Sequence, residues 1–511
     1  MDQAADLIET DVLVVGGGIN GAGIARDAAG RGLGVILCEK DDLAAHTSSA
    51  SSKLIHGGLR YLEHYEFRLV RKALGEREVL LRSAPHIMRP LRFVMPHDSG
   101  QRPVWLIRAG LYLYDTLARR EFLPGSEAVA LRSHDAGKAL KDVFTRGFVY
   151  SDGWVDDARL VVLNAIAARE RGASILTRTA CTALRRDAQH WTATLSHIDG
   201  GSVQVKARCL VNAAGPWAAR ILQSASSAPA RQALRLIKGS HIVVPRLFEH
   251  DYAYIFQHPD GRIVFAMPYE QEFTLIGTTD LDYEGDLDSV SISDAEVAYL
   301  CQLSNRYFKR AITPSDVVWT YSGVRPLVED NANNPAAATR DFRLEMDTAA
   351  APMLTVFGGK ITTFRKLAEE AVDRIAPMLG NRIGGWTAAA CLPGGDLYGG
   401  KPSNRGVLEF DRWVQGLARR YPWLPQPLAA RFAHAYGSRV EILLARRQGM
   451  HDMGRQIVPG LYSAEVEYLI EHEWATCAAD ILWRRSKLGL HVGPGSEQVL
   501  DEWIAQRMRA A

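Results

Sequence analysis

Residues 11–21 read DVLVVGGGING and decide the fold of this chain. The apolar run from Asp11 to Val15 predicts a buried strand, and the pattern from Ile19 to Ala29 predicts a helix directly after the glycine turn. A second buried strand is expected from Gly34 to Glu39. This order of strand, glycine turn, helix and strand predicts a βαβ unit.

The glycine turn fits the pattern G-x-G-x-x-G, which is typical of dinucleotide-binding proteins. Gly16 permits the tight turn, Gly18 lets the backbone approach a pyrophosphate, and Gly21 allows the helix to pack closely on the strand. The amino end of the helix attracts the anion, and Glu39 is placed to accept hydrogen bonds from the adenosine ribose. The contacts expected from this unit are those of Gly16, Gly18, Ile19, Asn20, Gly21 and Glu39.

The position of this fingerprint favours FAD over an exchangeable nicotinamide cofactor. The fingerprint lies at the extreme N-terminus, and other parts of the same domain return much later, with a helix near 157–171, a strand at 208–213 and a helix at 362–378. A discontinuous domain of this kind suits a flavin buried along it. Residues 211–217, VNAAGPW, end a strand with small residues, and we expect cofactor contacts there from Ala213, Gly215 and Trp217.

The rest of the chain predicts two further units. Residues 226–351 alternate β-like segments with turns, which favours a mostly antiparallel sheet. A glycine- and proline-rich linker at 392–402 is followed by helical patterns to the end of the chain. We therefore expect an α/β protein with a Rossmann-like, discontinuous FAD-binding domain (1–84, 145–225 and 352–388), a mostly antiparallel β substrate-binding and membrane-facing domain (85–144 and 226–351) and an α-helical C-terminal domain (389–511).

The composition is that of an ordinary globular protein, with 511 residues of which 47% are hydrophobic and 23% charged. A formal net charge of +2 gives no field that favours nucleic acid, so no nucleic-acid partner is expected. The six cysteines have no CxxC spacing, so neither zinc nor another metal is expected. Residues 1–10 contain acidic side chains and no apolar core, which argues against a secretory signal and for a cytoplasmic protein.

One basic and aromatic segment, residues 102–120, is a candidate for membrane contact. Its apolar run at 104–114 is shorter than the roughly 20 residues that a spanning helix needs, and Arg108 interrupts it. The flanking arginines would attract it to an anionic membrane surface, on which it could lie without crossing. A buried core helix remains the alternative.

Residues 47–63, TSSASSKLIHGGLRYLE, carry the strongest family resemblance in the chain. They resemble the flavin-dependent glycerol-3-phosphate dehydrogenases, within the broader group that includes D-amino acid oxidase. The resemblance covers nearly the whole chain and continues at residues 151–160, 237–241, 277–280, 321–326, 358–363 and 478–485.

The resemblance implies an enzyme that oxidises sn-glycerol 3-phosphate to dihydroxyacetone phosphate by hydride transfer from C2 to N5 of FAD. It also implies that a membrane quinone re-oxidises the flavin, and that the protein is bound peripherally to the cytoplasmic face of the inner membrane. A homodimer contact in the C-terminal domain is a further implication. The motifs at residues 471–474 and 483–485 are themselves typical of helix packing and surface charge.

The serine-rich loop and the glycine pair are expected to contact the flavin cofactor. The hydroxyls and backbone amides of the loop suit the pyrophosphate and ribityl chain, and Gly57 lets the backbone run beneath the flavin ring. Later in the chain, Lys360 at the start of a helix would stabilise negative charge on the reduced flavin. The expected contacts are those of Thr47, Ser48, Ser49, Ser51, Lys53, His56, Gly57, Leu59, Gly359, Lys360, Ile361 and Thr362.

A phosphorylated alcohol requires cations, and the planar guanidinium of arginine binds phosphate bidentately. Arg325 and Arg340 match the phosphate-binding arginines of the resembling family. Arg60 and Tyr61 would close the same pocket. Thr278 and Lys360 are further expected substrate contacts.

Oxidation of the C2 hydroxyl also requires a base, because the hydroxyl proton must leave as the carbonyl forms. His56 is the first candidate, since the pKa of a histidine lies near neutrality and the motif puts this one beside the flavin. His241 is the second candidate, and an arginine with a perturbed proton affinity is a third. The expected catalytic set is His56, His241, Arg325 and Lys360.

Two other functions stay open at this point. An oxidase of the same fold would pass electrons to oxygen and produce peroxide, and it would share every motif described above. A flavin-binding scaffold without turnover is the second alternative, although an arginine pocket beside the flavin argues against it.

Overall fold

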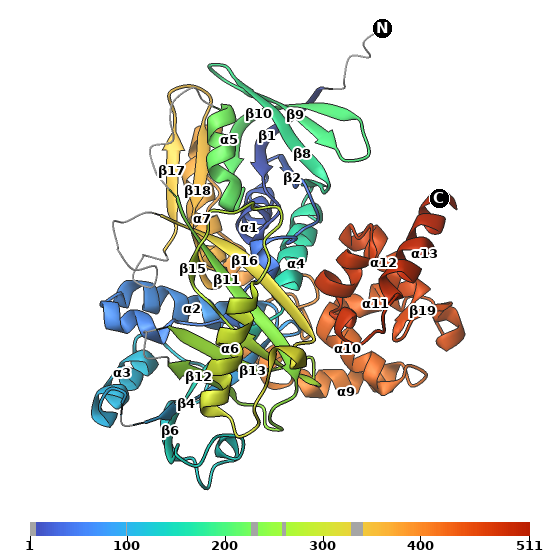
Figure 1. Cartoon of the computed structure of the whole chain (residues 1–511). Helices are drawn as coiled ribbons and strands as arrows, with labels where there is room; N and C mark the ends of the chain where they lie inside the picture. Colours follow the sequence, from blue (N-terminus) through green and yellow to red (C-terminus); the bar gives the residue numbers. More distant parts are fainter. Residues whose placement is uncertain (1–6, 99, 226–233, 258–261, 329–340, 511) are drawn as a thin grey trace.

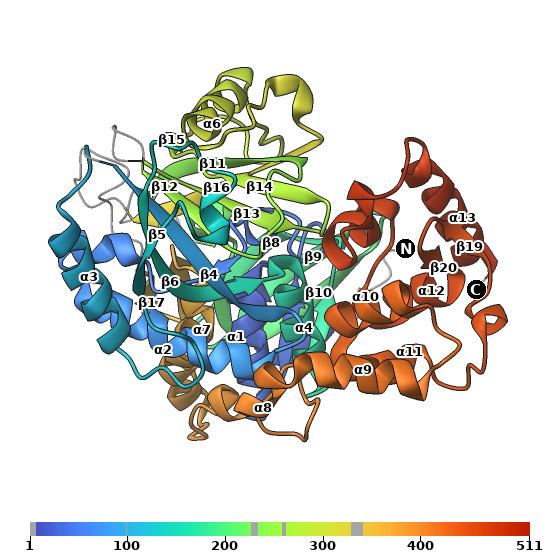
Figure 2. The same ribbon diagram turned by 90° about the horizontal axis from the view of Figure 1, so that it is seen from below.

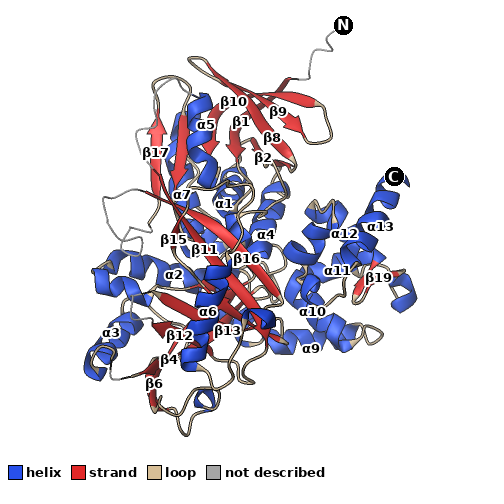
Figure 3. Cartoon of the chain, in the orientation of Figure 1, coloured by secondary structure: helices blue, strands red, loops and turns tan. Residues whose placement is uncertain are grey.

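The structure is a computed structural model that describes residues 7–98, 100–225, 234–257, 262–328 and 341–510. Two large sheets form its centre, and helices cover them on several sides (Figure 1, Figure 3). The elements after residue 400 form a group of their own beside these sheets, as the orange and red segments of Figure 2 show.

The first sheet has eight strands and carries the N-terminal βαβ unit. Its main path follows the order β17-β18-β10-β1-β2-β7, in which β18, β10, β1, β2 and β7 pair in parallel. The antiparallel strands β9 and β8 extend from β10. The strands are β1 (Leu7–Val15), β2 (Val35–Cys38), β7 (Ser174–Leu176), β8 (Thr179–Arg186), β9 (Trp191–His197), β10 (Ser202–Asn212), β17 (Arg343–Asp347) and β18 (Met353–Phe357).

Side chains alternate across β1, as expected for a strand that is buried on both faces. Val12 and Val14 join an apolar core with the helices, whereas Leu13 and Val15 join a core on the other face with β8, β9 and β10. The sheet is thus enclosed between a helix layer and its own antiparallel extension. The helices of this part are α1 (Ile19–Gly30), α4 (Asp157–Arg169), α5 (Ala218–Ala225) and α7 (Phe364–Ile375).

Small residues let α1 pack closely on its neighbours. A Cβ on Gly23 would lie 2.9 Å from Cδ2 of Phe364 on α7, so only glycine fits this helix contact without a shift. Asp27 and Arg31 form a buried ion pair of 2.6 Å one turn apart on the same helix. The glycine turn at the start of α1 is therefore held by the packing of the whole helix.

The second sheet has ten strands and is mostly antiparallel. Its main path is β15-β11-β14-β13-β12-β4-β6-β3, with β16 on β11 and β5 on β6. The ladder of β11 with β16 sets His241 opposite Tyr321 and Ile237 opposite Arg325. The strands are β3 (Leu54–Ile55), β4 (Met88–His97), β5 (Glu127–Ala130), β6 (Arg146–Val155), β11 (Leu234–Pro245), β12 (Ala253–Gln257), β13 (Ile263–Tyr269), β14 (Phe273–Gly277), β15 (Leu281–Asp282) and β16 (Trp319–Val328).

Three helices accompany the second sheet, namely α2 (Phe67–Ser83), α3 (Val104–Thr116) and α6 (Asp294–Tyr307). Ser293 and Glu296 form a capping box at the start of α6. Helix α3 buries Leu111 and Tyr114, and it exposes Trp105 and Tyr112. None of the helices in the described part of the chain has both the length and the apolar character that crossing a bilayer requires.

The C-terminal group is built around its own apolar core. It is mostly helical, as expected, but it also contains the short hairpin β19 (Gln456–Val458) and β20 (Leu461–Tyr462), and a π-helical turn at Asp480–Arg485. Its helices are α9 (Phe410–Arg420), α10 (Gln426–Tyr436), α11 (Val440–Leu443), α12 (Ser463–Glu473) and α13 (Ser496–Ala510). The short helix α8 (Asn404–Leu408) precedes them and packs through Val407 on the core of the first sheet.

These observations confirm the predicted fold class of a Rossmann-like part, a mostly antiparallel sheet and a helical C-terminal region. The sheets do not divide at the residue ranges proposed for the domains, however. Strand β6, within the range 145–225, pairs with β4 in the second sheet, and β17, within the range 226–351, pairs with β18 in the first. Both strands are recruited by neighbours that are distant in sequence, which no local pattern reveals.

Candidate active site

The glycine turn between β1 and α1 is shaped by close backbone contacts. Gly16 has a φ of 113°, and a Cβ there would lie 2.6 Å from the carbonyl oxygen of Ala213. A Cβ on Gly21 would overlap the carbonyl oxygen of Gly16. The hydroxyl of Ser48 accepts a hydrogen bond of 2.9 Å from the backbone N–H of Ile19, which ties the serine-rich loop to the start of the helix.

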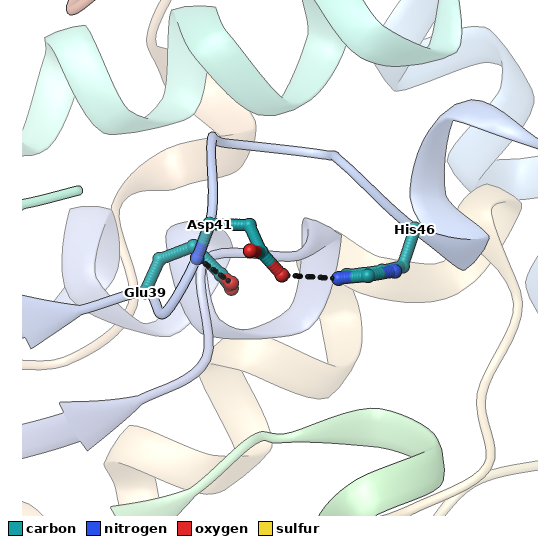
Figure 4. Close-up of side chains that lie close together, drawn as sticks. All are labelled: Glu39, Asp41 and His46. Carbon is teal, nitrogen blue, oxygen red and sulfur yellow. Dashed lines mark hydrogen bonds and ion pairs between the residues drawn. The ribbon is translucent and has the colours of Figure 1, made fainter. Parts of the chain in front are cut away.

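Glu39 follows β2 and is fixed by two backbone groups, of which Figure 4 shows the N–H of Asp41. Its carboxylate accepts hydrogen bonds from the N–H of Gly17 at 2.7 Å and from the N–H of Asp41 at 3.0 Å. Burial raises the pKa of the Glu39 carboxyl, although these bonds and nearby His46 oppose the shift. A partly buried carboxylate held in this way is available to ribose hydroxyls.

Glu39, Asp41 and His46 are also the one group, among the described residues, whose ligand atoms lie close enough to suggest a metal site. Nε2 of His46 lies 2.7 Å from Oδ2 of Asp41, and this hydrogen bond is the main reason that the pKa of Asp41 falls below its usual range. Both oxygens of Glu39 already accept backbone hydrogen bonds. The mutual hydrogen bonds favour a structural loop over a metal centre.

One cavity of about 400 Å³ runs between the two sheets. A volume of this size is in the range of small-molecule and cofactor sites. The cavity brings together most of the residues that the sequence predicts for cofactor, substrate and catalysis. Those that line it are Gly16, Gly18, Ile19, Asn20, Glu39, Thr47, Ser48, Ser51, His56, Tyr61, Ala213, Gly215, Trp217, His241, Thr278, Arg325, Gly359, Lys360, Ile361 and Thr362.

Other predicted residues do not line the cavity wall. Lys53 is buried, and its ammonium pairs with Asp157 at 2.8 Å. The hydroxyl of Ser49 donates to the carbonyl of His46. Arg340 lies outside the described residues. The remaining predicted residues away from the wall are Gly21, Gly57, Leu59 and Arg60.

His56 lies in the connection between β3 and the short helix at Leu59–His64. Its backbone N–H donates to the hydroxyl of Thr362 at 3.2 Å, and its ring meets the edge of Phe265. Nearby, the ammonium of Lys360 lies 3.5 Å from the centre of the Tyr61 ring. His56 and Tyr61 from one segment therefore line the same cavity as Lys360, which comes from a segment far away in the sequence.

Arg325 projects from β16 into the cavity and is oriented by Asp280. Its Nη2 lies 2.5 Å from Oδ1 of Asp280. A Cβ on Gly239 would lie 2.4 Å from Nη2 of Arg325 and 2.6 Å from Oγ1 of Thr278. The glycine on β11 thus makes room for both side chains.

His241 is a buried, neutral histidine. Its Nε2 lies 2.9 Å from the hydroxyl of Ser52, and its ring stacks on Tyr321 with centroids 4.7 Å apart. Burial lowers the pKa of His241 well below its ordinary value, and the charges of Lys53 and Arg325 add to the effect. This imidazole therefore carries no charge near neutral pH.

A buried polar group behind His56 was not predicted from the sequence. The N–H of Gly57 donates to the hydroxyl of Tyr114 at 2.9 Å and contacts Oδ1 of Asp152 at 3.3 Å. Tyr114 also donates to Asp152, whose carboxylate pairs with Arg77 at 2.8 Å. The available signal in the sequence was a charged residue within an apolar segment, as at Asp152 and Arg77. The three residues lie on β6, α2 and α3, however, and these elements are far apart in the sequence.

Known proteins are similar to this chain over nearly its whole length. Residues 11–365 match the family of FAD dependent oxidoreductases, and residues 385–510 match the C-terminal domain of alpha-glycerophosphate oxidase. The chain is 53% identical to a glycerol-3-phosphate dehydrogenase of Pseudomonas aeruginosa over 97% of its own length and 94% of that protein. It is 47% identical to a D-erythritol 1-phosphate dehydrogenase of Brucella abortus, with 97% of each chain covered.

A solved structure with FAD bound has a similar fold. The glycerol-3-phosphate dehydrogenase of Bacillus halodurans, solved in complex with FAD, superposes with a TM-score of 0.78 at 26% sequence identity. The match covers 98% of this chain and 91% of that structure. All three parts of the chain therefore have a counterpart in these relatives.

Proposed function

This chain belongs to the family of FAD-dependent oxidoreductases and, within it, to the group of the glycerol-3-phosphate dehydrogenases, and from this premise we propose that it oxidises sn-glycerol 3-phosphate to dihydroxyacetone phosphate. One observation carries the proposal. The glycine turn and Glu39 line the same cavity as His56, Arg325 and Lys360. A dinucleotide and a phosphorylated alcohol would therefore meet in one cavity.

The residues present fit FAD. At Gly18 a Cβ would lie only 3.0 Å from the hydroxyl of Ser48, so the glycine keeps open a cradle at the amino end of α1. We propose that this cradle holds the pyrophosphate, that Glu39 binds the ribose, and that residues 358–362 and His56 contact the flavin ring. Asn20 supports the far side of the cradle by donating to the carbonyl of Gly358.

For the substrate, we propose that Arg325 binds the phosphate with Arg340, and that Tyr61, Thr278 and Lys360 complete the pocket. The support for Arg325 is its place on the cavity wall beside Thr278. The carboxylate of Asp280 and the carbonyl oxygen of Thr279 hold Nη2 of this guanidinium in place at the cavity wall, and the planar guanidinium group suits a phosphate.

FAD, when bound, supplies a two-electron acceptor for the hydride that leaves C2 of the substrate. The chain itself must take the hydroxyl proton, and we propose His56 as the first candidate for this base. His241 is the second, but its strongly lowered pKa makes it a weak base, and Ser52 already occupies its Nε2. Lys360 would stabilise negative charge at the cofactor.

We propose a membrane quinone as the final electron acceptor, with the protein bound peripherally to the cytoplasmic face of the inner membrane. Helix α3 supports this proposal, because Trp105 and Tyr112 are 70% and 72% exposed on it. Arg108 on the same helix suits anionic headgroups. Oxygen is the competing acceptor, since residues 385–510 match a domain that is named after an oxidase.

The similarity to a D-erythritol 1-phosphate dehydrogenase favours a second candidate substrate. Its identity of 47% is only slightly lower than the 53% of the glycerol-3-phosphate dehydrogenase. A four-carbon polyol phosphate would present the same phosphate to Arg325 with one more carbon in the cavity. D-erythritol 1-phosphate is therefore a second, longer candidate substrate for the same site.

Anaerobic flavin reduction tests the proposal. The FAD-loaded protein is mixed with glycerol 3-phosphate, D-erythritol 1-phosphate or glycerol, and the flavin absorbance is followed. We expect rapid bleaching with glycerol 3-phosphate and none with glycerol, because only the phosphate engages Arg325.

The outcome separates the alternatives. Absence of bleaching with every phosphorylated alcohol would sink the enzyme proposal in favour of a scaffold. If D-erythritol 1-phosphate bleaches the flavin faster than glycerol 3-phosphate does, D-erythritol 1-phosphate is the preferred substrate. Re-oxidation of the bleached protein by a soluble quinone, compared with re-oxidation by oxygen with peroxide as product, then identifies the acceptor.

A further inference from the structure

The loop of residues 40–46 has one face toward the cavity and another toward the C-terminal group. It begins after Glu39, and Lys40, Ala44, Ala45 and His46 line the cavity. On this inner side, Trp217 contacts both the ring of His46 and the ammonium of Lys40. The shape of the loop thus determines the part of the cavity that we assign to the adenosine half of FAD.

On the outer side of the loop, the buried carboxylate of Asp42 is bound by two arginines of the C-terminal group. Arg485 donates from Nη1 at 2.5 Å and from Nη2 at 2.8 Å, one bond to each carboxylate oxygen. Arg484 adds a bond of 2.6 Å from Nε. The side chains of Asp42 and Arg485 are 1% and 0% exposed, so this is a fully desolvated, bidentate ion pair.

The π-helical turn that presents these arginines is itself fixed. The carboxylate of Asp480 accepts from Nη2 of Arg484 at 2.5 Å and from the N–H of Thr476 at 2.8 Å. Burial alone would raise the pKa of Asp480, but the charges of Arg485 and Arg484 outweigh it and hold the pKa below its usual range. Surface charge was expected here, and the structure instead buries Arg485.

Arg178, between β7 and β8, joins the same assembly from a third direction. Its side chain binds Asp480 at 2.8 Å, and its backbone N–H donates to the carbonyl of Asp41 at 2.8 Å. The next residue, Thr179, donates to the carbonyl of Glu39 at 2.7 Å. The loop is therefore held between β7–β8 on one side and the C-terminal group on the other.

We propose that the C-terminal group retains FAD by fixing the loop of residues 40–46 through Asp42. Asp42, Arg484 and Arg485 are positioning residues, because none of them lines the cavity. The inference rests on the proposed placement of the adenosine half against Glu39. Since binding linkage is reciprocal, bound FAD also strengthens the docking of the π-helical turn.

Asp42→Asn tests the inference by removing the charge and keeping the shape. FAD affinity is measured by titrating the apoprotein and following flavin fluorescence. Couplings between linked sites are typically about 5- to 150-fold, and we expect FAD to bind at least tenfold more weakly. ADP, which contains only the half of FAD next to this loop, should lose the same factor.

Glu170→Gln is the matched control, because Glu170 pairs with Arg439 at 2.5 Å between α4 and the C-terminal group without touching the loop. Its affinity for FAD should stay within twofold of the parent protein. If Asp42→Asn does not fold, Arg484→Gln replaces it, since that side chain is partly exposed and loses only one of the bonds to Asp42.

A second measurement excludes a merely structural role. FAD should slow amide hydrogen exchange of residues 476–487 in the parent protein and in Glu170→Gln, and it should do so much less in Asp42→Asn. Equal FAD and ADP affinities in Asp42→Asn and the parent protein would overturn the inference. That result would leave the proposed function intact, because flavin bleaching by substrate is read independently.

Discussion

Gly57 is confined from two sides, and this confinement determines where His56 lies. A Cβ on Gly57 would lie 2.5 Å from Cδ2 of Leu74 and 2.6 Å from the hydroxyl of Tyr114. The same hydroxyl accepts the N–H of Gly57 and donates to Asp152. Tyr114 therefore sets the backbone position immediately after the proposed base.

We predict that Tyr114→Phe lowers kcat/KM for glycerol 3-phosphate by about five- to tenfold, because one buried hydrogen bond contributes about 1 kcal/mol. FAD affinity should not change, since the hydrogen bonds of the Tyr114 hydroxyl go to Gly57 and Asp152 and not to the loop of residues 40–46. Steady-state kinetics and flavin titration measure both. Tyr112→Phe, on the exposed face of the same helix, is the control and should match the parent protein. Unchanged kcat/KM in Tyr114→Phe would show that the hydroxyl has no positioning role.

For individual residues, the sequence predicts a place in the site where that place follows from a local motif. Gly16, Gly18 and Glu39 belong to one continuous unit, and the structure brings all three to the cavity. Tyr114 and Asp152 could not be predicted, because their partnership depends on how α3 and β6 meet in space. Lys53 shows the opposite case, since its motif suggests a cofactor contact but its ammonium pairs with buried Asp157.

Helices α1 and α2 show how the packing around a helix can outweigh the intrinsic helix propensity of a residue. Gly23 in α1 faces Phe364 of α7, where a Cβ would lie 2.9 Å from the ring and 3.4 Å from the Cβ of Ala368. Gly75 in α2 has nothing within 4 Å of its would-be Cβ. Both glycines are within helices, so the same substitution should have opposite effects.

We predict that Gly23→Ala lowers the free energy of unfolding by about 1 kcal/mol, because overpacking typically costs about 1–3 kcal/mol and exceeds the gain in helix propensity. Gly75→Ala should raise it by up to about 1 kcal/mol. Chemical denaturation of the FAD-loaded proteins measures both values. The same sign for the two variants would contradict this account.

Element bounds were predictable where hydrophobic periodicity was local. The helix expected at 19–29 is observed at Ile19–Gly30, and the one expected at 157–171 is observed at Asp157–Arg169. The helix expected at 362–378 begins and ends with 3-10 turns around Phe364–Ile375. Strand partners were less predictable, as β6 and β17 show, because pairing depends on residues far away in the chain.

For the whole molecule, the boundary with the C-terminal group contains a buried histidine that should make folding sensitive to acid. His86 is buried against Gly394 and Gly437, and neither ring nitrogen has a hydrogen-bond partner among the described residues. Burial lowers the pKa of His86 well below its ordinary value, with further effects from the charges of Arg159 and His434. The folded protein therefore keeps this ring neutral.

Below about pH 6.5 the unfolded chain binds a proton on His86 and the folded protein does not, so stability falls as the pH falls. We predict that His86→Leu reduces the loss of unfolding free energy between pH 7 and pH 5.5 by about 1 kcal/mol. Denaturant titrations at the two pH values measure this loss. His451→Leu, at an exposed position, is the control, and its unfolding free energy should fall between pH 7 and pH 5.5 by as much as that of the parent protein.

Helix α3 connects the outer surface to the interior of the molecule. Its exposed side carries Trp105 and Tyr112, and its buried side carries Tyr114 next to the loop of His56. If the exposed side contacts the membrane, its aromatic residues should supply most of the apolar attraction.

We predict that Trp105→Ser with Tyr112→Ser abolishes sedimentation of the protein with anionic phospholipid vesicles at low salt. Anaerobic flavin bleaching should stay at the parental rate, because neither residue lines the cavity. Ile198→Ser, which removes an exposed apolar residue from the turn between β9 and β10, is the control and should sediment normally. Vesicle binding by the double variant would remove the support that α3 gives to the quinone proposal.

The strand order of the first sheet has a consequence for synthesis of the chain. β1 pairs with β2 early, but its other neighbour, β10, ends at Asn212, and the next strand, β18, ends at Phe357. At about 5–20 residues per second, roughly 20–70 s pass between the emergence of β1 and that of β18. During this interval the apolar side chains of the unit are incompletely covered, and the segment 358–362 of the cavity wall does not yet exist. We therefore expect the complete cofactor site to form only after residue 362 of the 511 residues has been made.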